Sequence, residues 1–168
     1  MKHARTTDGV DYRIRPITPA DAERERAFIT GLSPASRHAR FMHAVREPTD
    51  EFIRRLVEVD GVRDQALVAV LGEGAEERII GVARYCADDD GPDCELAVAV
   101  ADEWQCRGIG TTLVQALFAA AARAGFRAIY GTMLPDNARM LELAEHLGLT
   151  VEPRIADRST VRASRRLR

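Results

Sequence analysis

The chain has 168 residues, of which 46% are hydrophobic and 30% charged, and its formal net charge is −2. This balance is typical of one globular domain with a substantial core, and no apolar run is long enough to cross a bilayer. The small net charge gives no general attraction to nucleic acid or to membranes. Because the N-terminus also lacks the apolar stretch of a signal peptide, we expect a cytoplasmic protein that binds neither.

Taken in chain order, residues 1–11 predict a flexible lead-in, and residues 12–168 predict a single domain. Tyr12–Ile17 alternates as a strand. Thr18 is a good N-cap followed by proline, and Ser33-Pro34 repeats this signal. The predicted helices of this half are 18–29, 33–41 and 49–59, the last because its apolar residues recur at helical spacing.

The second half of the chain predicts mostly strands. Apolar runs bounded by glycine-rich or acidic turns give strands at 66–71, 78–86, 94–100 and 128–134. Helices are expected at 112–124 and from Ala138 to about Leu147, and strands at 150–155 and 159–163 could form a hairpin. The three cysteines and four histidines show no metal-ligand spacing, so we expect no metal site.

The run Gln105–Thr111 is the most informative motif, because it places two glycines between a strand and a helix. Such a turn directs backbone N–H groups and the positive end of a helix dipole at one spot, which suits a phosphate or pyrophosphate. Gly108 and Gly110 let a ligand approach the backbone closely, since they carry no Cβ. A turn that uses its glycines only for packing is the structural alternative.

Two common nucleotide-binding loops do not fit this run. A P-loop needs a lysine followed by Ser or Thr after its second glycine, and Lys2 is the only lysine of the chain. A dinucleotide-binding loop needs a third glycine or alanine, and this chain has Leu113 at that position.

The spacing of Gln105, Gly108 and Gly110 instead resembles the coenzyme A pyrophosphate loop of the GNAT superfamily of N-acetyltransferases. The order of the flanking strands and helices, with Asn137 before the last helix, extends this likeness over about half the chain. The resemblance implies an α/β (α+β) fold with a GNAT-like central mixed sheet of six to seven strands, flanked by helices on both faces.

The N-terminal half points to a subgroup of that superfamily. The stretch Gly31–Arg37, followed by Arg40-Phe41, resembles the acetyltransferase domain of bacterial protein lysine acetyltransferases.

The resemblance also implies where acetyl-CoA, the expected co-substrate, binds. The pyrophosphate would lie on the amides of Arg107 to Thr111, and the pantetheine arm beside a strand that separates from its neighbour. An N–H of this strand could polarise the thioester carbonyl. Asn137 could contact the arm, cap the helix that follows it, or do both. The implied coenzyme-binding residues are Val98, Val100, Gln105, Arg107, Gly108, Ile109, Gly110, Thr111, Asn137 and Met140.

Glu95 is the candidate general base. A solvent-exposed lysine amine has a pKa of about 10.4 and is mostly protonated at neutral pH, so a carboxylate beside the thioester could accept its proton. In the protein lysine acetyltransferases that this chain resembles, a glutamate at this strand position has that role. Glu95 is also the single acid in an apolar strand segment, where a charge is costly without a partner. A solvent-exposed or arginine-paired glutamate is the structural alternative.

The chain departs from the family pattern in one respect. Many relatives carry a tyrosine seven residues after the asparagine, as general acid for the leaving thiolate, and this chain has Ala144 there. Tyr130 in the preceding strand could substitute, or could simply belong to the core. A thiol of pKa about 8.5 is a tolerable leaving group without a dedicated acid.

The resulting hypothesis is an acetyl-CoA-dependent N-acetyltransferase that transfers the acetyl group directly to a primary amine, with a protein lysine as acceptor. A small-molecule amine acetyltransferase and a non-catalytic acyl-CoA-binding sensor domain are the alternatives. The sequence leaves open the acceptor, a general acid, any regulation, and whether the chain forms a homodimer.

Overall fold

The computed structural model describes residues 1–43, 47–89, 91–153 and 159–167. In this part of the chain, eight strands form one sheet in the order β1-β2-β3-β4-β5-β6-β8-β7. The strands are β1 (Lys2–Arg5), β2 (Asp11–Pro16), β3 (Asp64–Leu71), β4 (Arg78–Ala87), β5 (Asp93–Val100), β6 (Ala128–Met133), β7 (Thr150–Pro153) and β8 (Val161–Arg166). The helices are α1 (Ala22–Gly31), α2 (Pro34–Phe41), α3 (Asp50–Val57), α4 (Ile109–Ala124) and α5 (Ala138–His146), with short 3₁₀ helices η1 (Pro19–Asp21), η2 (Gly74–Glu76) and η3 (Asp102–Trp104).

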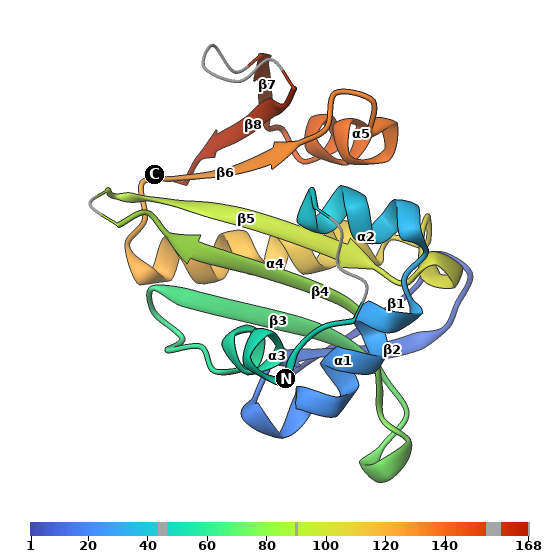
Figure 1. The fold of residues 1–168 in the computed structure, drawn as a ribbon. Coiled ribbons are helices and arrows are strands. Elements are labelled where there is room, and N and C mark those ends of the chain that lie inside the picture. Colours follow the sequence, from blue (N-terminus) through green and yellow to red (C-terminus); the bar gives the residue numbers. More distant parts are fainter. Residues whose placement is uncertain (44–46, 90, 154–158, 168) are drawn as a thin grey trace.

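Helices cover both faces of the sheet, as the sequence predicted (Figure 1). The alternation of side chains along β3 shows why both faces need cover, because every residue from Ala66 to Leu71 is apolar. Ala66, Val68 and Val70 are buried in a cluster with residues of α1 and α3. Leu67 and Ala69 are buried in a second cluster with residues of α4.

The first strand corrects the prediction of a flexible lead-in over residues 1–11. Lys2–Arg5 forms β1 and pairs antiparallel with β2, which brings the described sheet to eight strands instead of six to seven. The segment is mostly exposed, so its side chains show no apolar alternation that could reveal a strand. Its strand conformation depends on backbone hydrogen bonds to β2, which a sequence pattern does not display.

Helix α4 connects two parallel strands, β5 and β6, and packs closely against β4. A Cβ on Gly81 of β4 would lie 3.0 Å from Leu113 Cδ1 and 3.3 Å from Ile109 Cγ2. Glycine therefore allows the start of α4 to approach the sheet. This contact fixes the glycine turn that begins α4 beside the end of β5.

The C-terminal hairpin is confirmed in its described part. β7 pairs antiparallel with β8, and β8 lies between β7 and β6. Residues 154–158, which include the predicted end of the first of these strands, lie outside the described residues. No helix in the described ranges is both long and apolar enough to cross a membrane.

Candidate active site

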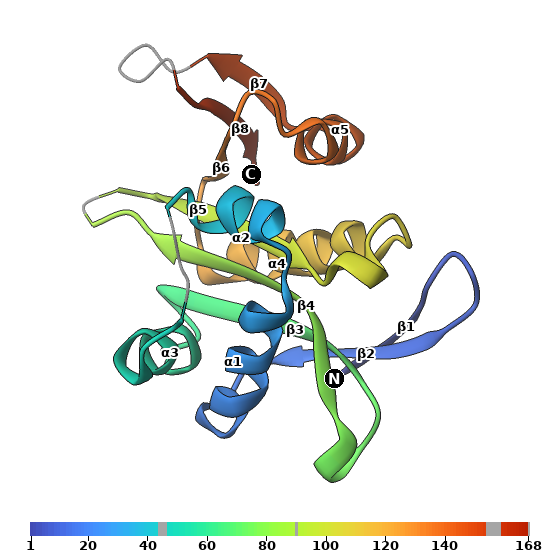
Figure 2. The same cartoon turned by 45° about the vertical axis from the view of Figure 1, so that its right-hand side comes forward.

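Strands β5 and β6 stay together for only three residue pairs, Asp93–Ala128, Cys94–Ile129 and Glu95–Tyr130. Beyond Glu95 they separate, although β5 continues to Val100 and remains paired with β4 on its other side. Figures 1 and 2 show β6, β8 and β7 diverging from the rest of the sheet. The edge of β5 after Glu95 therefore presents backbone groups that β6 does not use.

A cavity of about 820 Å³ lies at this separation. Its walls come from β5, the glycine turn, the start of α4, β6, α5 and, on the opposite side, α2. The volume is within the usual range of ligand pockets, roughly 300 to 1,000 Å³. The expected coenzyme-binding residues that line it are Val98, Val100, Gln105, Gly108, Ile109, Gly110, Thr111, Asn137 and Met140, whereas Arg107 and Glu95 are not among its lining residues.

The glycine turn leaves the N-terminus of α4 open. Gly108 is the N-cap residue with a φ of 83°, in the left-handed region that glycine adopts without strain, and no side chain caps the helix. The N–H groups of a first helical turn have no partner within the helix. Those of Ile109, Gly110 and Thr111 belong to residues that line the cavity, so this uncapped turn fits a pyrophosphate group.

The Arg107 side chain is directed elsewhere. Its Nη1 donates to Asp8 Oδ2 at 2.8 Å, and its guanidinium lies 4.7 Å from the centre of the Trp104 ring. The amide of Thr7 in turn donates to the Arg107 carbonyl at 3.1 Å. The loop between β1 and β2 thus supports the glycine turn from behind, and any contact of Arg107 with a coenzyme would use its backbone.

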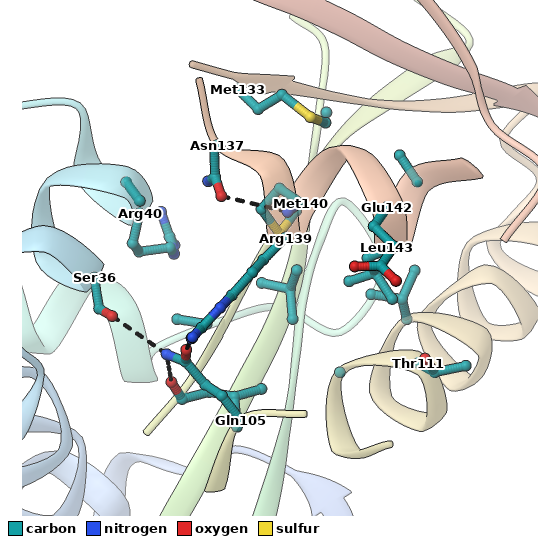
Figure 3. A pocket seen from close by; sticks show the side chains of 18 of the residues that line it. Ser36, Arg40, Gln105, Thr111, Met133, Asn137, Arg139, Met140, Glu142 and Leu143 are labelled. Atoms are coloured by element: carbon teal, nitrogen blue, oxygen red, sulfur yellow. Dashed lines mark hydrogen bonds between the residues drawn. The ribbon is translucent and has the colours of Figure 1, made fainter. Parts of the chain in front are cut away.

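Gln105 joins three elements around the mouth of the cavity (Figure 3). Its Nε2 donates to the Val100 carbonyl at 3.0 Å and to Ser36 Oγ of α2 at 3.2 Å. Its Oε1 accepts a hydrogen bond from Arg139 of α5. Arg139 and Ser36 also line the cavity, and because each lies more than 30 positions from Gln105 in sequence, no local pattern could have shown that they contact it.

Helix α2 is anchored to the segment that follows β5. Asp102 accepts hydrogen bonds from the Ser33 amide at 2.9 Å, from Ser33 Oγ at 2.8 Å and from Ser36 Oγ at 2.7 Å. Burial opposes the ionisation of Asp102, but these hydrogen bonds outweigh it and lower its pKa. The N-terminus of α2 is therefore held beside the glycine turn.

Asn137 is the N-cap of α5, which is one of the two roles expected for it from the sequence. Its Oδ1 accepts from the Met140 amide at 3.3 Å, and its side chain also lines the cavity. Figure 3 shows it at the end of the cavity where Arg40 and Met133 also lie. The side-chain NH₂ group stays available for a ligand in that space.

Glu95 stands where the two strands part. Its cross-strand neighbours are Cys86 and Tyr130, and Ala97, two residues further on the same face, lines the cavity. The side chain of Glu95 is exposed and has no hydrogen bond or ion pair with another described residue. A carboxylate at this rim can be reached from solvent, which suits a group that must accept a proton from an incoming amine.

The two positions considered for a general acid differ in their surroundings. Ala144 is buried on α5 and lines the cavity, so the alanine lies where the resemblance places a tyrosine. Tyr130 is not among the lining residues, and its hydroxyl donates to Asp88 Oδ1 at 2.7 Å. Burial and this hydrogen bond raise the pKa of Tyr130. The phenol is therefore a poor substitute for the missing acid.

Charged groups gather behind Glu95, on the face that carries α1 and α2. Glu25 of α1 and Arg84 of β4 are buried, at 3% and 9% exposure, and Arg40 of α2 lines the cavity. Burial raises the pKa of Glu25, although the nearby guanidinium groups of Arg84 and Arg40 oppose this. These three residues come from separate elements, so no sequence pattern predicted that they meet.

Comparison with known proteins agrees with this geometry. Residues 29–149 match the acetyltransferase (GNAT) family. The chain is 39% identical over 153 residues to a Pseudomonas aeruginosa protein named acetyltransferase PA5475, covering 91% of this chain and 82% of that one.

Two solved structures have the same fold. The GNAT domain of S. lividans PAT superposes with a TM-score of 0.90 at 27% identity, covering 98% of this chain and 96% of that domain. The structure of yncA from Salmonella typhimurium, described with its cofactor acetyl-CoA, has a TM-score of 0.75 at 20% identity, with 94% of each chain covered.

Proposed function

Because the chain belongs to the acetyltransferase (GNAT) family, we propose that it transfers an acetyl group from acetyl-CoA directly to a primary amine. The observation that carries this proposal is the cavity between β5 and β6, which joins an uncapped helix N-terminus to a strand edge that is not paired with β6 beyond Glu95. The first suits a pyrophosphate, and the second can hydrogen-bond an amide-bearing arm. The relative that is described with acetyl-CoA supports the same co-substrate.

Different residues of the chain would bind different parts of the coenzyme. The amides of residues 107–111 would receive the pyrophosphate, and the edge of β5 at Val98 and Val100 would pair with the pantetheine arm. An N–H of this edge would stabilise the negative charge that develops on the thioester oxygen. Asn137 and Met140 of α5 would face the arm from the other wall of the cavity.

Glu95 would act as the general base. Its carboxylate takes one proton from the acceptor ammonium, and the freed nitrogen lone pair forms the new C–N bond with the thioester carbon. The tetrahedral intermediate then collapses, and the electrons of the C–S bond leave with sulfur. The second nitrogen proton neutralises the thiolate through water, since Ala144 provides no acid, and Glu95 returns its proton to solvent.

We propose a protein lysine as the acceptor. Support comes from the segment Gly31–Arg37 with Arg40-Phe41, which resembles protein lysine acetyltransferases, and from the similarity to the S. lividans PAT domain. Glu95 is also exposed to solvent two residues from Ala97, which lines the cavity, so a long side chain could reach this carboxylate from solvent.

The test is release of free thiol when the protein is incubated with acetyl-CoA and a panel of amines. The panel would hold lysine-containing peptides, amino acids, polyamines and aminoglycosides. We expect thiol release that depends on the amine, with lysine peptides the best acceptors. Faster release with a small amine would replace the lysine acceptor, and tight coenzyme binding without thiol release for any amine would indicate a sensor domain.

A further inference from the structure

Arg40 occupies a position that the proposed chemistry has not used. It projects from α2 into the space that separates α2 from α5 (Figure 3), and it lines the cavity together with Ala97. Ala97 lies on the same face of β5 as Glu95, and α2 packs against this strand. The guanidinium and the Glu95 carboxylate interact electrostatically. An amine that reaches Glu95 therefore comes close to a fixed positive charge.

The guanidinium of Arg40 has no hydrogen bond or ion pair with any other described residue. It lies over the Phe41 ring, 4.7 Å from the ring centre. Burial and the nearby Arg84 lower the pKa of Arg40 to about 10, which still leaves the group charged at neutral pH. A partly buried arginine with no such partner in the described part of the chain is notable, because removing a charge from water is costly unless a partner or a ligand compensates it.

The neighbouring charges do not neutralise this cation. Arg40 and Arg84 both interact with one buried carboxylate, that of Glu25. Neither Glu25 Oε2 nor Arg84 Nε has a hydrogen-bond partner in the described structure. Burial raises the pKa of Glu25, although the two guanidinium groups oppose this. Neither Arg40 nor Arg84 is hydrogen-bonded to a carboxylate of the described residues, and of the two it is Arg40 that lines the cavity.

The ionisable groups that face Arg40 come from every element around it. They are Glu25 of α1, Arg84 and Cys86 of β4, and Glu95 of β5. On the far wall of the cavity lie Arg139, Glu142 and His146 of α5. Of these groups, Glu95 is the carboxylate that is both exposed and on the path of an acceptor entering over β5.

We propose that Arg40 disfavours the charged ammonium form of an acceptor bound beside Glu95, and so helps to deliver the neutral, nucleophilic amine. A positive charge close to an amine favours its uncharged state, and enzymes activate lysine nucleophiles in this way. Glu95 then accepts the proton that Arg40 helps to expel. The inference rests on the proposed function, because it assumes an amine acceptor and a base at Glu95.

The test is the pH dependence of turnover with the best amine from the panel, for the wild type, Arg40→Met and Arg40→Lys. The profile of kcat reports ionisations in the complex with bound substrates, so it monitors the bound amine. For Arg40→Met we expect the acidic limb of the pH profile of kcat to shift to higher pH by about one unit. At neutral pH this shift corresponds to an approximately tenfold loss of kcat. The loss should disappear toward about pH 9, and KM for the cationic acceptor should not rise.

Arg40→Lys keeps the charge, so its acidic limb should stay at the wild-type pH. Arg55→Met, which removes an exposed arginine of α3, is the matched control and should leave the profile unchanged. A loss of kcat in Arg40→Met that is the same at every pH would overturn the inference, since a structural or leaving-group role acts in that way. A limb that moves equally in the Met and Lys variants would also overturn it.

Glu95→Gln in the same series separates this inference from the proposed function. Turnover unaffected by Glu95→Gln would remove the base on which both depend. If Glu95→Gln reduces turnover but the acidic limb of the kcat profile of Arg40→Met stays at the wild-type pH, the proposed function stands and only the role of Arg40 is removed. If Arg40→Met does not fold, Arg40→Gln has the same expected profile and the same contradicting outcomes.

Discussion

Gly110 illustrates how one missing side chain shapes the cavity. It lies in the first turn of α4 at an ordinary helical position, so a larger residue there would not strain the backbone. A Cβ would meet Leu143 Cδ2 at 3.6 Å and Val100 Cγ2 at 3.7 Å, which are normal contact distances. The protein itself therefore tolerates a side chain at this position, and we attribute the glycine to the needs of a ligand.

The variant Gly110→Ala should consequently separate stability from binding. Alanine favours a helix over glycine by about 0.5 to 1 kcal/mol, so the free energy of unfolding should stay equal or rise. Coenzyme A affinity should fall by roughly tenfold, because the added methyl group narrows the cavity at the pyrophosphate turn. Urea unfolding and isothermal titration with coenzyme A measure the two effects.

Gly31→Ala provides the control for that pair of measurements. Gly31 also belongs to a helix, and a Cβ added there would meet no heavy atom within 4 Å. The variant Gly31→Ala should change the free energy of unfolding by a similarly small amount and leave the affinity for coenzyme A unaltered. Equal affinity of Gly110→Ala and the wild type would show that the coenzyme does not approach this turn.

The variant Glu95→Gln tests whether Glu95 is the general base. The amide keeps the shape and polarity of the side chain but cannot accept the proton, so kcat should fall at least about 100-fold at neutral pH. Coenzyme affinity should change little, since Glu95 is not a lining residue of the cavity. Glu58→Gln, an exposed residue at the end of α3, should behave as the wild type. Steady-state rates of thiol release decide between these outcomes.

Among the elements, α2 has the largest influence on the site relative to its size. It has only eight residues and none of them is buried, so its position depends on polar contacts more than on a core. Its N-terminus is held by Ser33, which caps the helix, and by the hydrogen bonds of Ser33 and Ser36 to Asp102. These bonds place Arg40, about two helical turns after Ser33, in the wall of the cavity.

Asp102→Ala should therefore loosen α2 without unfolding the protein. We expect faster amide hydrogen exchange in residues 35–41, while exchange in α3 and α4 stays as in the wild type. The loss of charged hydrogen bonds should cost about 1 to 3 kcal/mol locally. Glu103→Ala, which removes the next acidic residue and its contact with Arg78, is the control. Unchanged exchange in α2 would mean that Asp102 does not anchor it.

Across the whole molecule, one buried ion network joins the N-terminal elements to the loop between β3 and β4. Arg15 of β2 donates to both carboxylate oxygens of Asp21 at 2.7 Å and to Glu77 at 2.5 Å, and the Thr18 amide donates to Asp21 at 2.9 Å. Asp21 is 1% exposed. Burial opposes its ionisation, but these partners outweigh burial and lower its pKa to about 2.

Acid should weaken the fold through this residue. The folded-state pKa lies below the unfolded value of about 3.9, so the stabilisation is complete above that pH and is lost as pH falls toward about 2. We expect Asp21→Asn to lower the free energy of unfolding by roughly 2 kcal/mol at pH 7, and by much less near pH 2. Urea unfolding at both pH values measures this difference.

Asp11→Asn is a suitable comparison, because the Asp11–Arg5 pair has similar bidentate geometry but is exposed to solvent. Exposed pairs contribute little, so this variant should lose much less stability at pH 7. A destabilisation of Asp21→Asn that does not change with pH would place the effect in packing instead of charge.

The sequence predicted those parts of the molecule that depend on local patterns. The apolar runs, the proline and serine caps and the two glycines of the turn located most strands and helices, and the family resemblance implied nine residues that line the cavity. It did not predict β1, whose exposed residues carry no alternation. Nor could it predict that Arg107 points at Asp8, 99 positions away, or that Arg40 faces the rim where Glu95 lies. Such contacts arise only when distant elements pack together.

In the proposed function, the coenzyme lies where β5 and β6 separate, with its thioester beside Glu95. A crystal structure of Glu95→Gln with acetyl-CoA tests this most directly, because the variant should bind the coenzyme without consuming it. We predict the pyrophosphate on the amides of residues 107–111, the arm along Val98 and Val100, and the acetyl group facing residue 95. A coenzyme bound outside this separation, or with its acetyl group turned away from residue 95, would contradict the account.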